Sequence, residues 1–335
     1  MEEFQKLNAI ERSTLSMDNL CEYYRDLRKY VIESGEKIKG VNFHKAVHPI
    51  VDFLIKGRRI VKGQKLTVYN KVDKNQKSPI IFAITHTGKY DIEIANEAIK
   101  SPYYLLSDDE EYMHRTVDGY VTAFNGVIYV DSDYPEDQLV AKKTAVQLLK
   151  QGANVMWYPE GIWNLSPNQL ILPCKYGIID AALEAKATII PIALDQRDKH
   201  FYVNIGDPIS YDEWNVDDRT NKAQMIEAIN TLRDKMATLK YDIWLKFPTE
   251  SREDIPDDYY EKFVEEKIDE WPYFTREVLE KRIYKPKNIV TEEEAFKHLE
   301  NINIDKNNAF LLRKQYRRWC CFLLILISIY GTMKL

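Results

Sequence analysis

The sequence predicts an α/β protein with a mixed, largely parallel central sheet of about seven strands flanked by helices. Between residues 65 and 240, short β-rich runs alternate with helical runs, the pattern of strands joined by crossover helices. Several of the β-rich runs are continuously apolar, as expected of central strands covered on both faces. A hydrophobic content of 45% over 335 residues supplies enough apolar material for one large domain with an extension.

The expected strands are short runs rich in β-branched and aromatic residues. They are Leu66–Tyr69, Ile80–Thr85, Tyr103–Leu106, Val127–Val130, Val155–Tyr158, Thr188–Ala193 and Phe201–Ile205. Helical periodicity between them predicts crossover helices at Ile92–Ile99, Gln138–Lys150 and Ile178–Lys186. In such sheets, functional sites gather in the loops beyond the carboxyl ends of the strands.

Composition divides the chain into four segments. An N-terminal helical segment (1–64) precedes the α/β domain (65–240), and an acidic helical extension packed on the core (241–318) follows it. The last segment (319–335) begins with an apolar run after a basic cluster, which suits an end that dips into an anionic leaflet. That run is shorter than the about 20 residues of a spanning helix, and burial against the core or a partner chain is the alternative.

In the first segment, Asn42–Arg58 carries apolar residues at helical spacing and cations near its end. Such a helix can lie on a membrane, but docking against the protein core is the favoured interpretation. The opening residues include Glu2 and Glu3 and no apolar run, so we expect no secretory or transit signal and a cytoplasmic catalytic part.

Charge and cysteine content argue against two classes of protein. A net charge of −5 argues against a general nucleic-acid binder, because neutralising phosphates requires a surplus of Lys and Arg on one face. The four cysteines fit neither a disulfide framework nor the spacing of a zinc site, so we expect reduced thiols and no metal.

The strongest motif is the segment His86–Asp91, which follows an apolar strand and precedes a helical run. A histidine in that loop can accept a proton from an attacking hydroxyl near neutral pH. A carboxylate bonded to its other ring nitrogen would fix the tautomer and stabilise the imidazolium, and Asp91 is placed to do this. The alternative is that Asp91 only caps the helix and His86 is an ordinary loop residue.

A second motif, Trp157–Gly161, also follows a β-rich run and turns into a loop. Pro159 and Gly161 flank Glu160, so the backbone sets the direction of the acid. An acid held at a strand end suits the binding of acceptor hydroxyl groups. The alternative is a simple turn with a solvent-facing acid.

Together these motifs resemble the glycerolipid acyltransferase family typified by lysophosphatidate acyltransferases, whose first block has the form H-x4-D and whose third reads F-P-E-G. Four further elements agree with the family's second block, its fourth block, its lysine-glycine element and its late glycine-proline turn. They are Gly126–Asp131, Ile190–Ala193, Cys174–Gly177 and Gly206–Ile209. Six matches in the right order span about the middle half of the chain, which makes chance a poor explanation.

The resemblance implies an O-acyltransferase that moves a fatty acyl group from acyl-CoA or an acyl carrier protein to a hydroxyl of a lysophospholipid or related lipid. His86 would be the general base and Asp91 its orienting partner, with no metal or other cofactor. Glu160 and Gly161 would help to hold the acceptor, and Lys175 is the matched cation. Membrane lipids would be the partners, at the cytoplasmic face of a membrane, with peripheral or monotopic attachment.

The sequence departs from the family where the acceptor is bound. The second block of the family ends in an arginine and the third continues with threonine and arginine, whereas Ser132, Ile162 and Trp163 stand here. A phosphate without guanidinium partners loses its strongest contacts. Lys89, Lys142 and Lys143 are candidate substitute cations. Trp163 is either an apolar or sugar-stacking wall or a plain core tryptophan. The acceptor is therefore either a lysolipid whose phosphate is held by lysines, or a glycolipid or saccharide hydroxyl.

Two other interpretations stay open. A non-catalytic lipid-binding relative would explain the missing arginines, although His86, Asp91 and Glu160 argue against it. A soluble α/β hydrolase or transferase lacks support, because no G-x-S-x-G nucleophile elbow occurs in the sequence.

Overall fold

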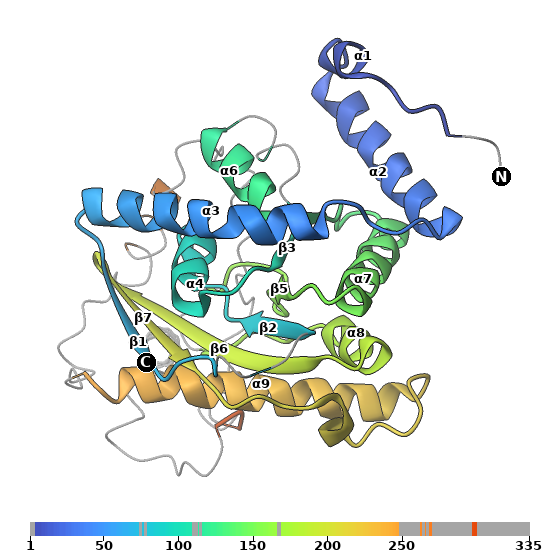
Figure 1. The fold of residues 1–335 in the computed structure, drawn as a ribbon. Coiled ribbons are helices and arrows are strands. Elements are labelled where there is room, and N and C mark those ends of the chain that lie inside the picture. The colour runs from blue at the N-terminus through green and yellow to red at the C-terminus, as the bar shows by residue number, and fades with distance from the viewer. Residues whose placement is uncertain are drawn as a thin grey trace, which may run out of the picture.

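The computed structural model describes residues 4–73, 76, 79–108, 113, 116–165 and 169–247, with a few single positions between 262 and 299. These residues form a seven-stranded sheet with the order β1-β7-β6-β2-β5-β3-β4 (Figure 1). All neighbouring strands run parallel except β6 and β7. The prediction of a mixed, largely parallel sheet is therefore confirmed. The strands are β1 (Lys65–Tyr69), β2 (Ile80–Ile84), β3 (Tyr104–Ser107), β4 (Val127–Tyr129), β5 (Val155–Trp157), β6 (Thr188–Arg197) and β7 (His200–Ile205).

The clearest difference from the predicted strands is the length of β6. This strand runs through Arg197, beyond the predicted end at Ala193, because it continues as a hairpin in which Arg197 pairs with His200 of β7. The polar residues at the end of the hairpin broke the apolar run from which the strand was predicted.

Helices cover both faces of the sheet (Figure 1). One face is covered by α7 (Pro135–Lys150), α8 (Gly177–Ala185) and α9 (Lys222–Trp244), and the short η1 (Tyr211–Trp214) contacts α8. The other face is covered by α4 (Asp91–Ile99). The helix α3 (Val41–Val61) contacts both α4 and α6 (Val117–Asn125). At the N-terminal end, α1 (Ala9–Ser13) and α2 (Met17–Ser34) extend from the body, and α2 contacts α7.

The central strand β2 contributes to the cores on both faces. Ile81 and Ala83 join the cluster under α7, α8 and α9, whereas Ile80, Phe82 and Ile84 join the cluster under α4. All five side chains are buried. This burial on both faces explains why the strand is apolar at every position and not at alternate ones.

The N-terminal helix predicted at Asn42–Arg58 is α3, and it packs against α4 and α6. Among the helices that the structure describes, none is long and apolar enough to cross a membrane.

The predicted extension (241–318) and the apolar segment (319–335) lie almost wholly outside the described residues. The helix α9 crosses the predicted boundary at residue 240 and ends at Trp244. His298 Nδ1 lies 2.7 Å from Asp234 Oδ1 on α9, and Leu299 is buried in the same core cluster as α9. These contacts place this part of the predicted extension against α9, while the segment boundaries stay predictions.

The backbone before β4 requires glycine at position 126. Gly126 has a φ of 104°, and a Cβ added there would lie 2.9 Å from Tyr104 Cδ1. We expect Gly126→Ala to lower the free energy of unfolding by about 2–4 kcal/mol, because both the backbone and the tyrosine ring must shift. Urea denaturation measures this loss.

Gly152 provides the control for this substitution. It has a φ of 78°, but a Cβ added there meets no atom within 4 Å. Gly152→Ala should therefore cost only about 1 kcal/mol, the cost of the left-handed backbone. Equal losses in the two variants would show that contact with Tyr104 does not constrain position 126.

Candidate active site

The two motif loops meet at one edge of the sheet. His86 follows β2 and Glu160 follows β5, and these strands pair in parallel with Ala83 opposite Trp157. Their carboxyl ends therefore lie side by side. The backbone N–H of His86 donates to Glu160 Oε1 at 2.9 Å, which joins the two loops directly.

His86 and Asp91 form a hydrogen-bonded pair. His86 Nδ1 lies 2.9 Å from Asp91 Oδ2, and the two side chains are 17% and 5% exposed. Because an ionised carboxylate only accepts, Nδ1 donates in this bond, and in the neutral imidazole Nε2 then keeps its lone pair. The pair thus has the arrangement of a general base with an orienting carboxylate.

Asp91 also organises the loop in which His86 lies. Its Oδ2 accepts the N–H of Thr87 at 2.5 Å and that of Gly88 at 2.9 Å, and its Oδ1 accepts the Thr87 hydroxyl at 2.8 Å. Asp91 is the first residue of α4, where the helix dipole favours a negative charge. Its recorded bonds run back to the loop and not forward into the helix, so the capping alternative does not describe this residue.

Two aromatic rings hold the imidazole in place. The ring of Tyr158 stacks on His86 with centroids 4.4 Å apart, and the ring of Trp163 lies at 5.3 Å. Both are buried. The N–H of Asn164 donates to the carbonyl of His86 at 2.7 Å. Trp163 therefore lies against the histidine, while its contribution to acceptor binding stays a prediction.

Glu160 is buried, and both of its carboxylate oxygens accept backbone N–H groups. Oε1 accepts from His86, and Oε2 accepts from Leu172 at 2.8 Å. Burial raises the pKa of Glu160, while Lys240 and the two backbone donors act in the opposite direction. Glu160 therefore ties together the loops around His86 and Leu172. The sequence did not indicate this, because a backbone donor carries no residue-type signal.

The two predicted lysines, Lys175 and Lys89, are each close to a residue of the motif loops. A Cβ at Gly161, which has a φ of 74°, would lie 3.2 Å from Lys175 Nζ, so Lys175 lies beside the Pro-Glu-Gly turn. Lys89 lies over the ring of Tyr90 at 5.4 Å. Burial, together with nearby Lys62 and Arg58, lowers the pKa of Lys89.

Where the second block of the family ends in an arginine, Ser132 and its neighbour Asp131 form other contacts in this protein. Ser132, which stands at the end of the second block, donates its backbone N–H and its hydroxyl to Asp108 at 3.1 and 2.5 Å. Its neighbour Asp131 accepts from Arg25 Nη1 of α2 at 2.7 Å. Arg28, one turn later in α2, pairs with Asp137 at 2.8 Å. The sequence reasoning missed these α2 arginines, although their spacing places them on one helix face.

Cys174 lies near this site but is not an activated thiol. Burial and the charge of Glu160 raise its pKa far above the usual range, so the thiol stays protonated near neutral pH. Within the described ranges, no group of three or more histidine, cysteine, aspartate or glutamate side chains is arranged to hold a metal.

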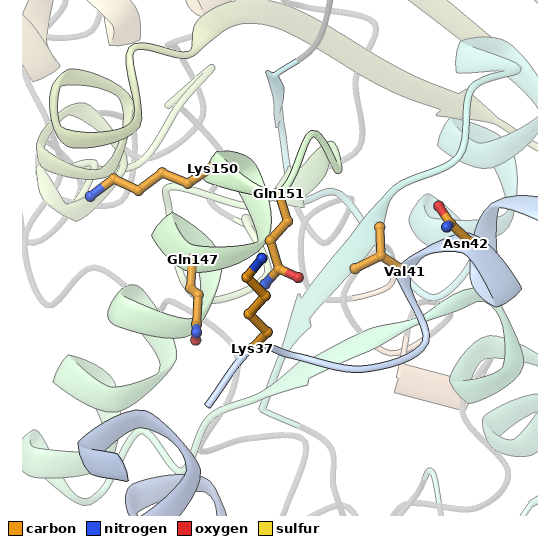
Figure 2. Close-up of a pocket in the computed structure, with 6 residues that line it drawn as sticks. All are labelled: Lys37, Val41, Asn42, Gln147, Lys150 and Gln151. Carbon is orange, nitrogen blue, oxygen red and sulfur yellow. The ribbon is translucent and has the colours of Figure 1, made fainter. Parts of the chain in front are cut away.

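A cavity of about 530 Å³ lies elsewhere in the molecule (Figure 2). It is lined by Lys37, Val41, Asn42, Gln147, Lys150 and Gln151. The end of α7 contributes three of these residues, and the chain leads from there into the amino end of β5. The cavity therefore lies at the opposite edge of the sheet from His86.

The strand-rich part of the chain that carries the motifs is similar to a known protein family. No curated protein matches the sequence. One similar solved structure is that of the 1-acyl-sn-glycerophosphate (LPA) acyltransferase PlsC from Thermotoga maritima, at 12% identity and a TM-score of 0.47 over 67% of this chain and 88% of that chain. Residues 65–195 match a family model described as Acyltransferase, and this range contains His86, Asp91 and Glu160. Residues 65–195 are therefore similar to the acyltransferase family that the motifs resemble.

Proposed function

We propose that the protein is an O-acyltransferase that moves a fatty acyl group from an acyl-CoA or acyl carrier protein thioester to a lipid hydroxyl. The observation that carries the proposal is the His86–Asp91 pair at the carboxyl end of β2. This pair lies inside the range that matches the acyltransferase family model.

The reaction uses the free nitrogen of His86 as a general base. Nε2 takes the proton of the acceptor hydroxyl as its oxygen attacks the thioester carbonyl. Collapse of the tetrahedral intermediate breaks the carbon–sulfur bond, and the imidazolium returns the proton to the leaving thiolate. Asp91 stabilises the imidazolium between these steps and keeps the ring in one tautomer. No covalent bond to the enzyme forms.

The acceptor in this proposal is a lysolipid or related lipid with a free hydroxyl. Lys175 is the matched family cation, and its ammonium group lies beside Gly161. It is therefore our candidate for holding an acceptor phosphate. A lipid acceptor must reach the site from a membrane, so we also propose a peripheral or monotopic position at the cytoplasmic face.

Loss of the base should abolish most turnover. We expect His86→Ala to lower kcat by about 10²–10⁴, the usual contribution of a general base. The measurement is acyl transfer by purified protein with acyl-CoA and a lysolipid. His200→Ala, on β7, is the control and should keep native activity. Native turnover by His86→Ala would support the non-catalytic relative or a different base.

Glu160 should affect the rate and not the affinity for the acceptor, since both of its oxygens accept backbone N–H groups. In Glu160→Gln an amide –NH₂ faces one of these donors, which misplaces the loop of His86. We expect kcat to fall about tenfold or more, while KM for the acceptor stays within about twofold. A rise in acceptor KM at unchanged kcat would instead support direct contact with the acceptor.

Lys175 should discriminate between acceptors with and without phosphate. We expect Lys175→Met to raise KM for lysophosphatidate about tenfold and to leave KM for a monoacylglycerol unchanged. Lys222→Met, an exposed lysine at the start of α9, is the control with native values for both. Equal effects on the two acceptors would exclude Lys175 as the phosphate ligand.

A further inference from the structure

The helix α9 carries one charged side chain into the interior of the protein. Of the lysines and arginines that the structure describes, only Lys240 is buried, with 5% of its surface exposed. Figure 1 shows α9 along one face of the sheet, where it contacts β6 and β7. A buried ammonium is costly unless an opposite charge lies close to it. The position of Lys240 therefore calls for an anionic neighbour inside the protein.

Spacing along α9 places Lys240 on the side of the helix that meets the segment bonded to Glu160. Arg233 of α9 donates to the carbonyl of Ile171 at 2.7 Å. Positions 233 and 240 are about two helical turns apart, so their side chains lie on the same side of α9. The next residue after Ile171 is Leu172, whose N–H donates to Glu160 Oε2 at 2.8 Å. Lys240 and the segment that holds Glu160 therefore share one side of the helix.

Two carboxyl groups lie close enough to Lys240 for its charge to act on them. They are Glu160, after β5, and Asp195 of β6. Burial raises the pKa of each, and the ammonium of Lys240 lowers it. Asp195 has a second cation, because it also lies 3.5 Å from Arg197. Among the charged side chains, Lys240 has the largest effect on the pKa of Glu160, so Glu160 is the acid that depends on it most.

The other titratable and charged groups around Glu160 and Lys240 do not replace this cation. They come from β6, from α9 and from the loops that follow β2 and precede α8, and they are His86, Cys174, Asp195, Arg197 and Arg233. The thiol of Cys174 stays protonated. His86 acts on Glu160 less than Lys240 does, and Arg233 is bonded to the Ile171 carbonyl. Lys240 therefore carries the charge compensation of Glu160.

The ionised form of Glu160 is the form that can hold both loops. A carboxylate accepts at both oxygens, whereas a carboxylic acid has a hydroxyl hydrogen that needs an acceptor of its own. The bonds from the His86 and Leu172 N–H groups are also stronger when the acceptor is charged. We infer that Lys240 is a positioning residue for acyl transfer, because its buried ammonium keeps Glu160 ionised and Glu160 holds the loop of His86. This inference deepens the proposed function and rests on it for the reaction.

The pH dependence of kcat in the full-length protein tests this inference. Without Lys240, Glu160 should take up a proton at a higher pH than in the native protein, since the largest effect that opposes burial is lost. We expect Lys240→Met to lower the ratio of kcat at about pH 6 to kcat at about pH 8.5 by about tenfold. The KM for the acceptor at the higher pH should stay within about twofold of the native value.

Two further variants show whether charge is the relevant property. Lys240→Arg keeps the charge and should restore the native ratio of kcat values. Lys222→Met, an exposed lysine at the start of α9, should also have the native ratio. If Lys240→Met lowers kcat by the same factor at both pH values, or if Lys240→Arg changes the ratio as Lys240→Met does, the lysine is merely structural and the inference is overturned.

A charge-balanced variant covers the case in which Lys240→Met alone does not fold. Lys240→Met, Asp195→Asn removes one charge of each sign, and circular dichroism should show native folding for it. We expect the same change in the ratio of kcat values as for Lys240→Met, while Asp195→Asn alone keeps the native ratio. A native ratio in the double variant would mean that Lys240 acts through Asp195, which overturns the inference.

Infrared spectroscopy follows the proton on Glu160 without using catalytic activity. When the pH falls from about 8.5 to about 6, Lys240→Met should gain the absorption of one more protonated carboxyl group than the native protein does. Lys240→Met, Glu160→Gln should lack this absorption. If it appears as expected but the native protein transfers no acyl group, the link from Lys240 to Glu160 stands and the proposed function fails. If Lys240→Met gives the native spectrum, the inference fails and acyl transfer by His86 is unaffected.

Discussion

The position of the imidazole depends on one carboxylate that serves the fold and the site at once. Asp91 accepts from the ring of His86 and from three donors of the adjoining loop, so ring orientation and loop shape are coupled. Glu160 then fastens that loop to the end of β5 through the His86 N–H. Because parallel pairing of β2 with β5 brings these loops together, the geometry of the base follows from strand order.

Near this edge of the sheet, burial and a neighbouring lysine have opposite effects on the pKa values of two carboxyl groups. Burial raises the pKa of both Glu160 and Asp195, and the nearby Lys240 of α9 lowers the pKa of each. The net shift of each acid is upward, so each folded-state pKa lies above its unfolded value. The folded protein then binds protons more tightly, and this contribution to stability weakens as pH rises through the raised pKa values. The buried ammonium of Lys240 offsets part of the cost of one buried and one partly buried carboxylate, which makes α9 an electrostatic support of the site as well as a packing element.

Sequence reasoning succeeded where a local pattern has one structural outcome. Runs rich in β-branched and aromatic residues located every strand of the sheet, and the motif loops at strand ends located His86 and Asp91 next to each other. It failed where contacts join distant or backbone groups. The bond from the Leu172 N–H to Glu160 has no residue-type signature, and the pair of Arg25 with Asp131 joins segments separated by 106 positions. The sequence also did not predict which face of α3 meets the protein, because periodicity reveals two faces of a helix but not which of them is buried.

That orientation has a physical consequence for how α3 is stabilised. Its polar face is satisfied by Glu93 and Glu97 of α4 and by Asn125 of α6, so turning the helix over would leave these buried groups without partners. Ion pairs, hydrogen bonds and the buried side chain of Val51 therefore hold the helix on the protein, and an apolar face that includes Ile50 and Phe53 is left outward. In water that face gains nothing from folding, since burial of apolar area is what stabilises a surface helix.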